Sequence, residues 1–166
     1  RSQTVTGVQT CALPISAELT QGAGSVALSV DSDPSLIELD ISSSGYASKD
    51  VDDFFRPLGS EIAKVKGQYS IKCYNESLES AFLDHCERRG ESPQDVLYNT
   101  DYFALHTPFH NMPETAMSEL LESRLGLNRE ETVNFLKERN FYDGVRPIGD
   151  IGNIYSGSVY AVLAFL

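Results

Sequence analysis

The sequence lacks any apolar run that approaches the roughly 20 residues of a membrane-spanning helix. No hydrophobic segment follows a basic start in the manner of a secretory leader. From these absences we expect a cytoplasmic protein with no membrane partner. Internal repeats and low-complexity segments are also missing, and 166 residues suit one globular domain or part of a larger one.

Positive charge is scarce. The chain has 13 Lys and Arg against 24 Asp and Glu, which gives a net charge of −11 at pH 7. Nucleic acids attract proteins through clustered basic side chains, so DNA and RNA are not expected partners. Anionic lipid surfaces should likewise repel the chain.

Cysteine is rare and unevenly spaced. The three cysteines are Cys11, Cys73 and Cys86. An odd number without ligand-like spacing fits reduced thiols rather than a disulfide framework or a zinc site, and we expect no metal. Cys73 and Cys86 fall in an amphipathic stretch, so we interpret them as packing residues.

The first 16 residues do not follow a protein-like pattern. Residues 5–15, VTGVQTCALPI, resemble the conceptual translation of a common sequencing adapter. We therefore interpret residues 1–16 as an assembly artefact and residues 17–166 as the protein domain, truncated at both ends. Cys11 is accordingly not considered as a nucleophile.

Alternating apolar residues from Val26 to Val30 predict a strand. A turn signal at 31–34 and a second apolar stretch over 36–41 predict that the two strands form a hairpin. Gly22 and Gly24 precede a strand rather than a helix, so they indicate close backbone packing and not a nucleotide site. Residues 46–67 predict a loop with helical turns.

Helices are expected over four stretches. Apolar spacing predicts an amphipathic helix from Tyr69 to Gly90. Ser92 followed by Pro93 indicates the start of a short helix. Another helix should run from Pro113 to Gly126, and Asn128 with Glu131 resembles a capping box for a helix that ends near residue 140.

The chain is organised around residues 101–109, DYFALHTPF, where large apolar residues lead to His106 and then Pro108. This pattern predicts a buried strand that presents an imidazole at its C-terminal end, where open α/β sheets place their chemistry. The alternative interpretation is a core histidine at a strand terminus.

Residues 149–158, GDIGNIYSGS, place glycines and Asn153 before the apolar run 159–166. Glycine lets the backbone approach a ligand, and the carboxamide offers a donor. His106 and Asn153 would therefore make a pair that holds a carbonyl oxygen as it gains charge. The alternative is an ordinary helix start with Asn153 as its cap.

Five motifs in order resemble the 3-hydroxy-3-methylglutaryl-CoA synthase family of the thiolase superfamily, including its branch that acts on acyl carrier proteins in polyketide synthesis. They are GAGSVA at 22–27, FRP at 55–57, SIKCY at 70–74, FALHTPF at 103–109 and GNIYSGS at 152–158. The resemblance implies an α/β chain, part of the thiolase-like layered α/β/α/β/α fold.

The family condenses an acetyl group carried on a cysteine with an acetoacetyl thioester, using a glutamate as acid and base. The resemblance implies His106 as the catalytic histidine, with Asn153 and Ser70 as substrate-binding residues. It also implies no cofactor, CoA or phosphopantetheine thioesters as substrates, and a homodimer. The family's cysteine and glutamate would lie upstream of this sequence, so the 166-residue chain is expected to be inactive.

One departure bears on the carrier. The family has lysines shortly after its histidine motif, whereas this chain reads HNMPET at 110–115, which disfavours CoA. An acidic carrier protein would need a basic patch, for which Arg88 and Arg89 are the candidates. The rival functions are a ketoacyl-ACP synthase III-like enzyme, which usually follows its histidine with Gln-Ala-Asn, and a non-catalytic acyl-carrier-binding paralogue.

Overall fold

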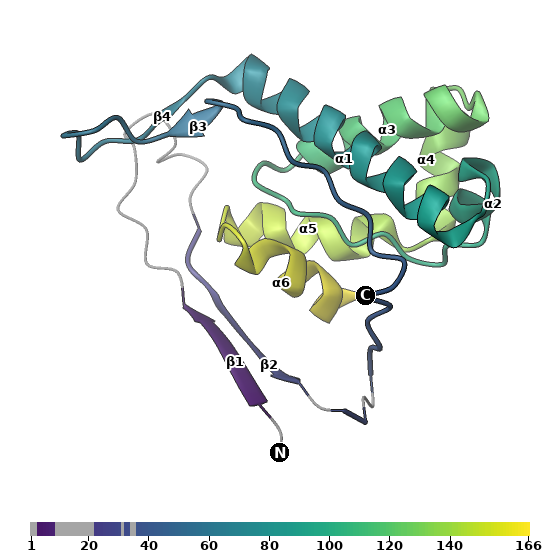
Figure 1. Cartoon of the computed structure of the whole chain (residues 1–166), viewed down its shortest axis with the longest axis horizontal. Helices are drawn as coiled ribbons and strands as arrows, with labels where there is room; N and C mark the ends of the chain where they lie inside the picture. The colour runs from purple at the N-terminus through teal and green to yellow at the C-terminus, as the bar shows by residue number, and fades with distance from the viewer. Residues whose placement is uncertain (1–2, 9–21, 31, 34–35) are drawn as a thin grey trace.

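The computed structural model describes residues 3–8, 22–30, 32–33 and 36–166. Its strands are β1 (Gln3–Val8), β2 (Ser25–Val30), β3 (Phe54–Phe55) and β4 (Lys64–Val65). Its helices are α1 (Gly67–Arg89), α2 (Pro93–Tyr98), α3 (Met112–Leu125), α4 (Arg129–Glu138), α5 (Phe141–Ile151) and α6 (Gly157–Phe165). The α/β class expected from the sequence is confirmed (Figure 1). In this part of the chain, every helix is too short or too polar to cross a membrane.

The helix boundaries follow the capping signals in the sequence. Gly90 ends α1 in the left-handed region, with φ of 67°, which glycine adopts at little cost. The Ser92 side chain accepts a hydrogen bond from the Asp95 backbone N–H at the start of α2. Asn128 and Glu131 form the predicted capping box of α4. These local predictions are confirmed.

Helix α5 was not predicted, because Gly144, Pro147 and Gly149 all disfavour a helix interior. Its tertiary contacts explain two of them. A Cβ on Gly144 would lie 2.9 Å from Val162 Cγ1, and one on Gly149 would lie 2.7 Å from His110 Nδ1. Both glycines therefore permit close packing that a propensity argument cannot detect.

We expect Gly144→Ala to lower the free energy of unfolding by about 1–3 kcal/mol, because the added methyl meets the stiff, fully buried Val162. Urea unfolding of the intact protein measures the change. Gly67→Ala is the matched control, since its Cβ would meet nothing within 4 Å, and it should shift stability by less than about 1 kcal/mol. Equal effects of the two substitutions would contradict the packing argument.

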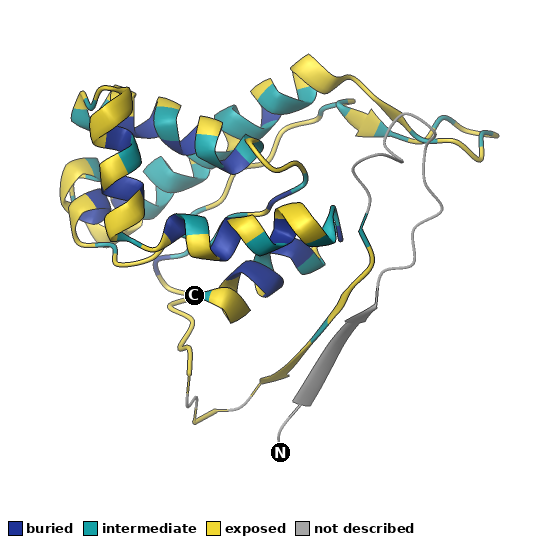
Figure 2. Ribbon diagram, turned by 180° about the vertical axis from the view of Figure 1, so that it is seen from behind, coloured by how far each residue is buried: buried dark blue, intermediate teal, exposed yellow. Residues whose placement is uncertain are grey.

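The core consists of two apolar clusters. The first joins α2, α3, α4 and the start of α5 through Leu97, Met117, Leu120, Leu121, Phe135, Leu136, Phe141 and Val145. The second joins α5 and α6 through Ile148, Ile154, Ala161 and Val162, with Val26 of β2 against it. Figure 2 shows the buried positions concentrated in these helices, whereas residues 36–53, which precede β3, are largely exposed.

The segment 101–107 forms neither helix nor strand, and it makes no strand ladder with other described residues. Its side chains alternate: Phe103 and Leu105 pack against the first cluster and Ala104 against the second. The predicted strand is therefore wrong as a sheet element in this part of the chain. Neighbouring side chains contact different clusters here because the segment lies between helices, and such packing does not supply hydrogen-bond partners for the backbone.

The predicted hairpin between β2 and residues 36–41 is also wrong. β2 pairs antiparallel with β1 from Gln3↔Val30 to Val8↔Ser25, while Leu36 and Leu39 are 95% and 77% exposed. Alternation indicates a strand's faces without specifying its partner. The turn at 31–34 lies partly outside the described residues.

Two further predictions fall in the first half of the chain. The short β3–β4 pair replaces the helical turns expected over 46–67, because the chain there folds back on itself in an antiparallel bridge. The adapter origin of residues 1–16 stays a prediction.

Both cysteines of α1 behave as packing residues. Cys73 and Cys86 are buried and free, as expected, whereas Cys11 lies outside the described residues. Burial raises the pKa of the Cys86 thiol, which disfavours the reactive thiolate.

Candidate functional site

His106 is held by two neighbouring helices at the end of the segment 101–107. Its Nδ1 lies 2.7 Å from Ser158 Oγ, in the first turn of α6. The backbone N–H of Thr107 donates to the same Oγ at 3.0 Å. On the other side, the Tyr74 hydroxyl of α1 donates to the His106 carbonyl at 2.7 Å. The imidazole is therefore held from α6, and the backbone of His106 is held from α1.

The environment favours a neutral imidazole. His106 retains solvent exposure as a residue, yet desolvation of its ring lowers its pKa below the ordinary value. The ring is therefore uncharged at neutral pH, with one nitrogen as donor and the other as acceptor. Burial raises the pKa of Tyr74, so its hydroxyl stays protonated and available as a donor.

Asn153 lies in the turn between α5 and α6. Its Oδ1 accepts from the Tyr155 backbone N–H at 2.8 Å, and Tyr155 has φ of 55°. Ser156, not Asn153, is the N-cap of α6, so the interpretation of Asn153 as a helix cap is wrong. The side-chain oxygen instead closes a local Asx turn, which leaves Nδ2 as the donor group of the carboxamide.

The glycine motif near the start of the domain packs under this turn. Gly22 N–H donates to the Asn153 carbonyl at 2.9 Å. A Cβ on Gly22 would lie 2.1 Å from the Ile151 carbonyl oxygen, a distance that no side chain tolerates. The prediction of close backbone packing is therefore confirmed for Gly22.

A cavity of about 280 Å³ lies beside His106. It brings together the 107–110 segment, the end of α5 and the following turn, and its lining residues are Thr107, Pro108, Phe109, His110, Ile148, Gly149, Asp150, Ile151, Gly152 and Asn153. His106 precedes this lining directly, so the histidine and asparagine segments meet at one cavity. None of the described residues that line it is Lys or Arg.

Ser70 lies farther from this cavity. Its hydroxyl donates to Asp53 Oδ2 at 3.0 Å, and it does not line the cavity that includes Asn153. Ser70 precedes Tyr74 by one helical turn of α1, so the two side chains share the face that contacts His106.

Sequence reasoning missed Ser158 and Tyr74 as contacts of His106. Both lie inside quoted motifs, but they are 52 and 32 residues from His106 along the chain. Neither helical nor strand spacing relates residues at such separations, so no local signal could have joined them to His106.

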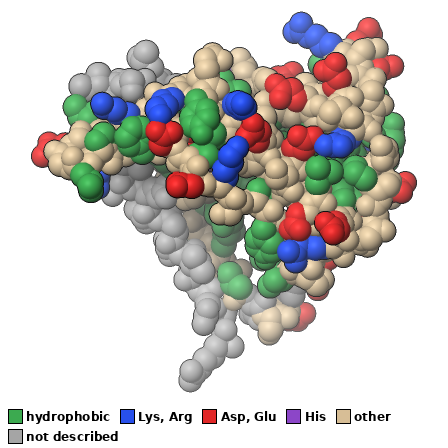
Figure 3. Space-filling view, turned by 45° about the horizontal axis from the view of Figure 1, so that its top comes forward, with side chains coloured by type: hydrophobic (Ala, Val, Ile, Leu, Met, Phe, Trp, Pro, Cys, Tyr) green, Lys and Arg blue, Asp and Glu red, His purple; other side chains and the backbone are tan. Residues whose placement is uncertain are grey.

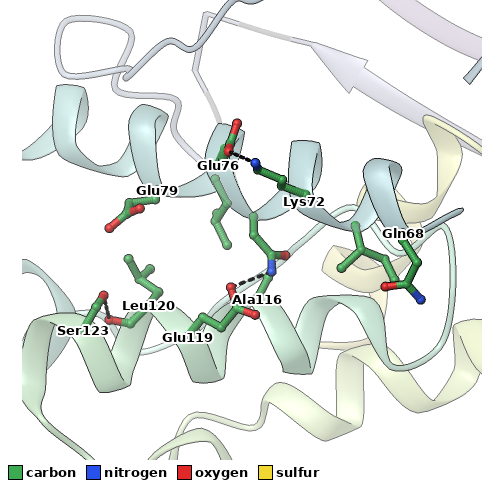
Figure 4. A pocket seen from close by; sticks show the side chains of 11 residues that line it. Gln68, Lys72, Glu76, Glu79, Ala116, Glu119, Leu120 and Ser123 are labelled. Atoms are coloured by element: carbon green, nitrogen blue, oxygen red, sulfur yellow. Dashed lines mark hydrogen bonds and ion pairs between the residues drawn. The ribbon is translucent and has the colours of Figure 1, made fainter. Parts of the chain in front are cut away.

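A second cavity, of about 510 Å³, lies between α1 and α3 (Figure 4). Lys72 and Glu76 form an ion pair on its rim, and Asn75 Nδ2 donates to Glu119 Oε2 at 2.7 Å. Glu79 is paired with Arg124. The groove therefore has largely compensated charges, and it shares no lining residue with the cavity beside His106. In the described part of the chain, no group of three or more His, Cys, Asp or Glu side chains is placed to hold a metal.

Comparison with known proteins identifies the family. A family model described as hydroxymethylglutaryl-coenzyme A synthase C terminal matches residues 37–146. The chain belongs to this family. The resemblance carried by the five motifs is thus confirmed, and the match favours hydroxymethylglutaryl-CoA synthases over ketoacyl-ACP synthase III-like enzymes.

Two curated relatives represent two branches of the family. The hydroxymethylglutaryl-CoA synthase of Haloferax volcanii is 32% identical over 180 residues, covering 86% of this chain and 39% of that protein. The polyketide biosynthesis 3-hydroxy-3-methylglutaryl-ACP synthase PksG of Bacillus subtilis is 29% identical over 153 residues, covering 89% and 34%. The chain therefore spans less than half the length of these relatives.

The solved structure of the curacin biosynthetic pathway HMG synthase superposes with a TM-score of 0.87 at 24% identity. The match covers 98% of this chain and 39% of the other. It confirms the thiolase-like fold expected for the chain.

Proposed function

We propose that the intact protein condenses an acetyl group with an acetoacetyl thioester to form a 3-hydroxy-3-methylglutaryl thioester. The observation that carries the proposal is the neutral His106 imidazole, fixed by Ser158 next to the cavity that Asn153 lines. When an enolate carbon attacks the ketone carbon, the carbonyl electron pair moves to oxygen and creates an alkoxide. Nitrogen donors from His106 and Asn153 suit that developing charge.

The nucleophile and the proton-transfer group are not assigned to residues of this chain. In the proposed reaction a base removes a methyl proton from the cysteine-bound acetyl group, the new carbon–carbon bond forms, and the alkoxide takes up a proton. Water then cleaves the thioester to the enzyme. Cys86 does not suit the nucleophile, because it is 3% exposed and its pKa is raised by burial.

The substrate carrier follows from the chemistry beside His106. CoA has a diphosphate and a 3′-phosphate, which proteins commonly bind through Lys and Arg. The described cavity lining offers neither residue, and Asn111 and Thr115 follow at the start of α3 where the family has lysines. A carrier-protein thioester has a single phosphodiester and gains affinity from protein contacts. We therefore assign an acyl carrier protein as carrier, as in the name of the PksG relative.

The predicted Arg88 and Arg89 patch is weakened as a receiving surface for that carrier by its acidic neighbours. Arg88 Nε lies 2.8 Å from Asp84 Oδ2, and Arg89 lies 2.6 Å from Glu91 Oε1. Each guanidinium thus has an acidic partner. Figure 3 likewise shows basic and acidic side chains interspersed on the face in view.

The test is to give the intact protein an acetyl donor with acetoacetyl-CoA or acetoacetyl-ACP at matched ionic strength. We expect 3-hydroxy-3-methylglutaryl thioester by mass spectrometry, with kcat/KM at least about tenfold higher for the ACP thioester, since the lost charge-assisted bonds penalise CoA. Asn111→Lys should improve kcat/KM for the CoA thioester and leave the ACP value unchanged. Asn111 suits this change because it is exposed and its side chain makes no cap bond.

A preference for the CoA thioester would reject the carrier argument. Binding of acyl-ACP without product from either thioester would favour the non-catalytic paralogue instead.

The proposed reaction uses thioester substrates and requires no cofactor. The proposed setting is the cytoplasm, where buried free thiols such as Cys73 and Cys86 persist, and the proposed assembly is a homodimer, as the family resemblance implies.

A further inference from the structure

We infer that the Ser158 hydroxyl fixes His106 in the tautomer that has its hydrogen on Nε2, which makes Ser158 a positioning residue for the histidine. The inference rests on the proposed function for its catalytic meaning. Its structural content is independent of that function, because it concerns the location of one hydrogen atom in the resting protein.

The inference rests on the hydrogen bonds that the Ser158 hydroxyl can make. Ser158 is fully buried, and Thr107 is 1% exposed. The Thr107 N–H can only donate, so at 3.0 Å the Ser158 oxygen acts as acceptor. The other neighbour of that oxygen is His106 Nδ1 at 2.7 Å. Among the described residues, Nδ1 is thus the one acceptor within reach of the hydroxyl hydrogen.

The reverse arrangement leaves a buried group unsatisfied. If Nδ1 had the hydrogen, the Ser158 oxygen would accept from both Thr107 and His106, and its own hydrogen would have no acceptor among the described residues. An unpaired donor at a fully buried position is costly. Nδ1 is therefore the bare nitrogen, and Nε2 has the hydrogen in the neutral ring.

Helix α6 makes this arrangement rigid. Ser158 lies in its first turn, and Ala161 and Val162 anchor the next turn in the α5–α6 cluster. The Tyr74 hydroxyl fixes the His106 backbone from the other side. The ring therefore cannot rotate freely, and Nε2 is presented as a ready donor for a developing alkoxide.

Protonation of the ring at Nδ1 would likewise leave the Ser158 hydroxyl hydrogen without an acceptor among the described residues. This cost agrees with the lowered pKa of His106. The titratable groups that contact His106 or line the adjacent cavity are Tyr74 of α1, His110 and Asp150. Desolvation is the cause of the lowered pKa, so these neighbours do not account for it.

The test is two-bond ¹H–¹⁵N correlation NMR on the intact protein labelled at histidine, with His106 assigned from His106→Gln. At a pH at which the ring is neutral, we expect a bare Nδ1 and a protonated Nε2. Ser158→Ala should give averaged tautomer signals and lower kcat about tenfold with little change in KM. Ser158→Cys retains a weak donor and should restore part of both readouts.

Ser156→Ala is the matched control. It removes a hydroxyl just before Ser158 in the chain, and that hydroxyl is exposed and makes no helix-cap hydrogen bond. It should leave the tautomer and kcat unchanged. A wild-type spectrum with hydrogen on Nδ1 would overturn the inference even if Ser158→Ala failed to fold, as would an unchanged tautomer in folded Ser158→Ala. A fixed Nε2–H tautomer in a protein whose His106→Ala variant condenses normally would refute the proposed function and leave the inference standing.

Discussion

Replacement of His106 by Ala is expected to slow condensation by about 10²–10³, the usual scale for the loss of one oxyanion donor. Because Ser158 fixes the imidazole and desolvation lowers its pKa, we expect it to contribute a preorganised hydrogen bond to the developing alkoxide. Acetylation of the nucleophile comes before this charge develops and should persist. Single-turnover assays that follow acetyl-enzyme and product separately measure the two steps.

Two variants sharpen this experiment. Asn153→Ala should act in the same direction as His106→Ala, because both nitrogen donors would contact one oxygen. His85→Ala is the matched control: it also removes an imidazole, but its Nδ1 lies 2.6 Å from the Ser43 carbonyl and it does not line the cavity. Equal loss of acetylation and condensation in His106→Ala would mean that the histidine has been given the wrong role.

Phe141→Ala is expected to lower the free energy of unfolding by about 3–5 kcal/mol. The side chain is fully buried at the start of α5, within the cluster that joins α2, α3 and α4. Its ring also meets Tyr142 edge to face, with centroids 5.5 Å apart. Truncation therefore removes apolar contacts and leaves a cavity that the surrounding helices cannot close.

Urea unfolding of the intact protein at a fixed concentration measures this loss. Phe165→Ala is the control, because the same truncation in α6 removes a side chain that is 48% exposed, and it should cost less than about 1 kcal/mol. If both substitutions cost the same, the cluster around Phe141 would not be the principal core of this chain.

Local chemistry made much of the helical half predictable. Ser92, Gly126, Asn128 and Glu131 act within a few residues of themselves, as side-chain caps or as a left-handed helix end. Such interactions need no distant partner, so they can be read along the chain. The same holds for the choice of His106 and Asn153 as candidates, since each stands where an apolar segment meets a turn.

By itself the sequence determined the capped helix ends at Gly90, Ser92, Gly126 and Asn128, the family and the two candidate donors, because caps and motifs consist of neighbouring residues. Tertiary structure alone decided that residues 101–107 lie between helices without a ladder, that β2 pairs with β1, and that the glycines of α5 are tolerated. It also decided that Ser158 meets His106 across 52 residues. Each of these features depends on which distant segment packs against the element. Sequence periodicity indicates which face of a helix or strand is buried, but it does not identify the segment that buries it.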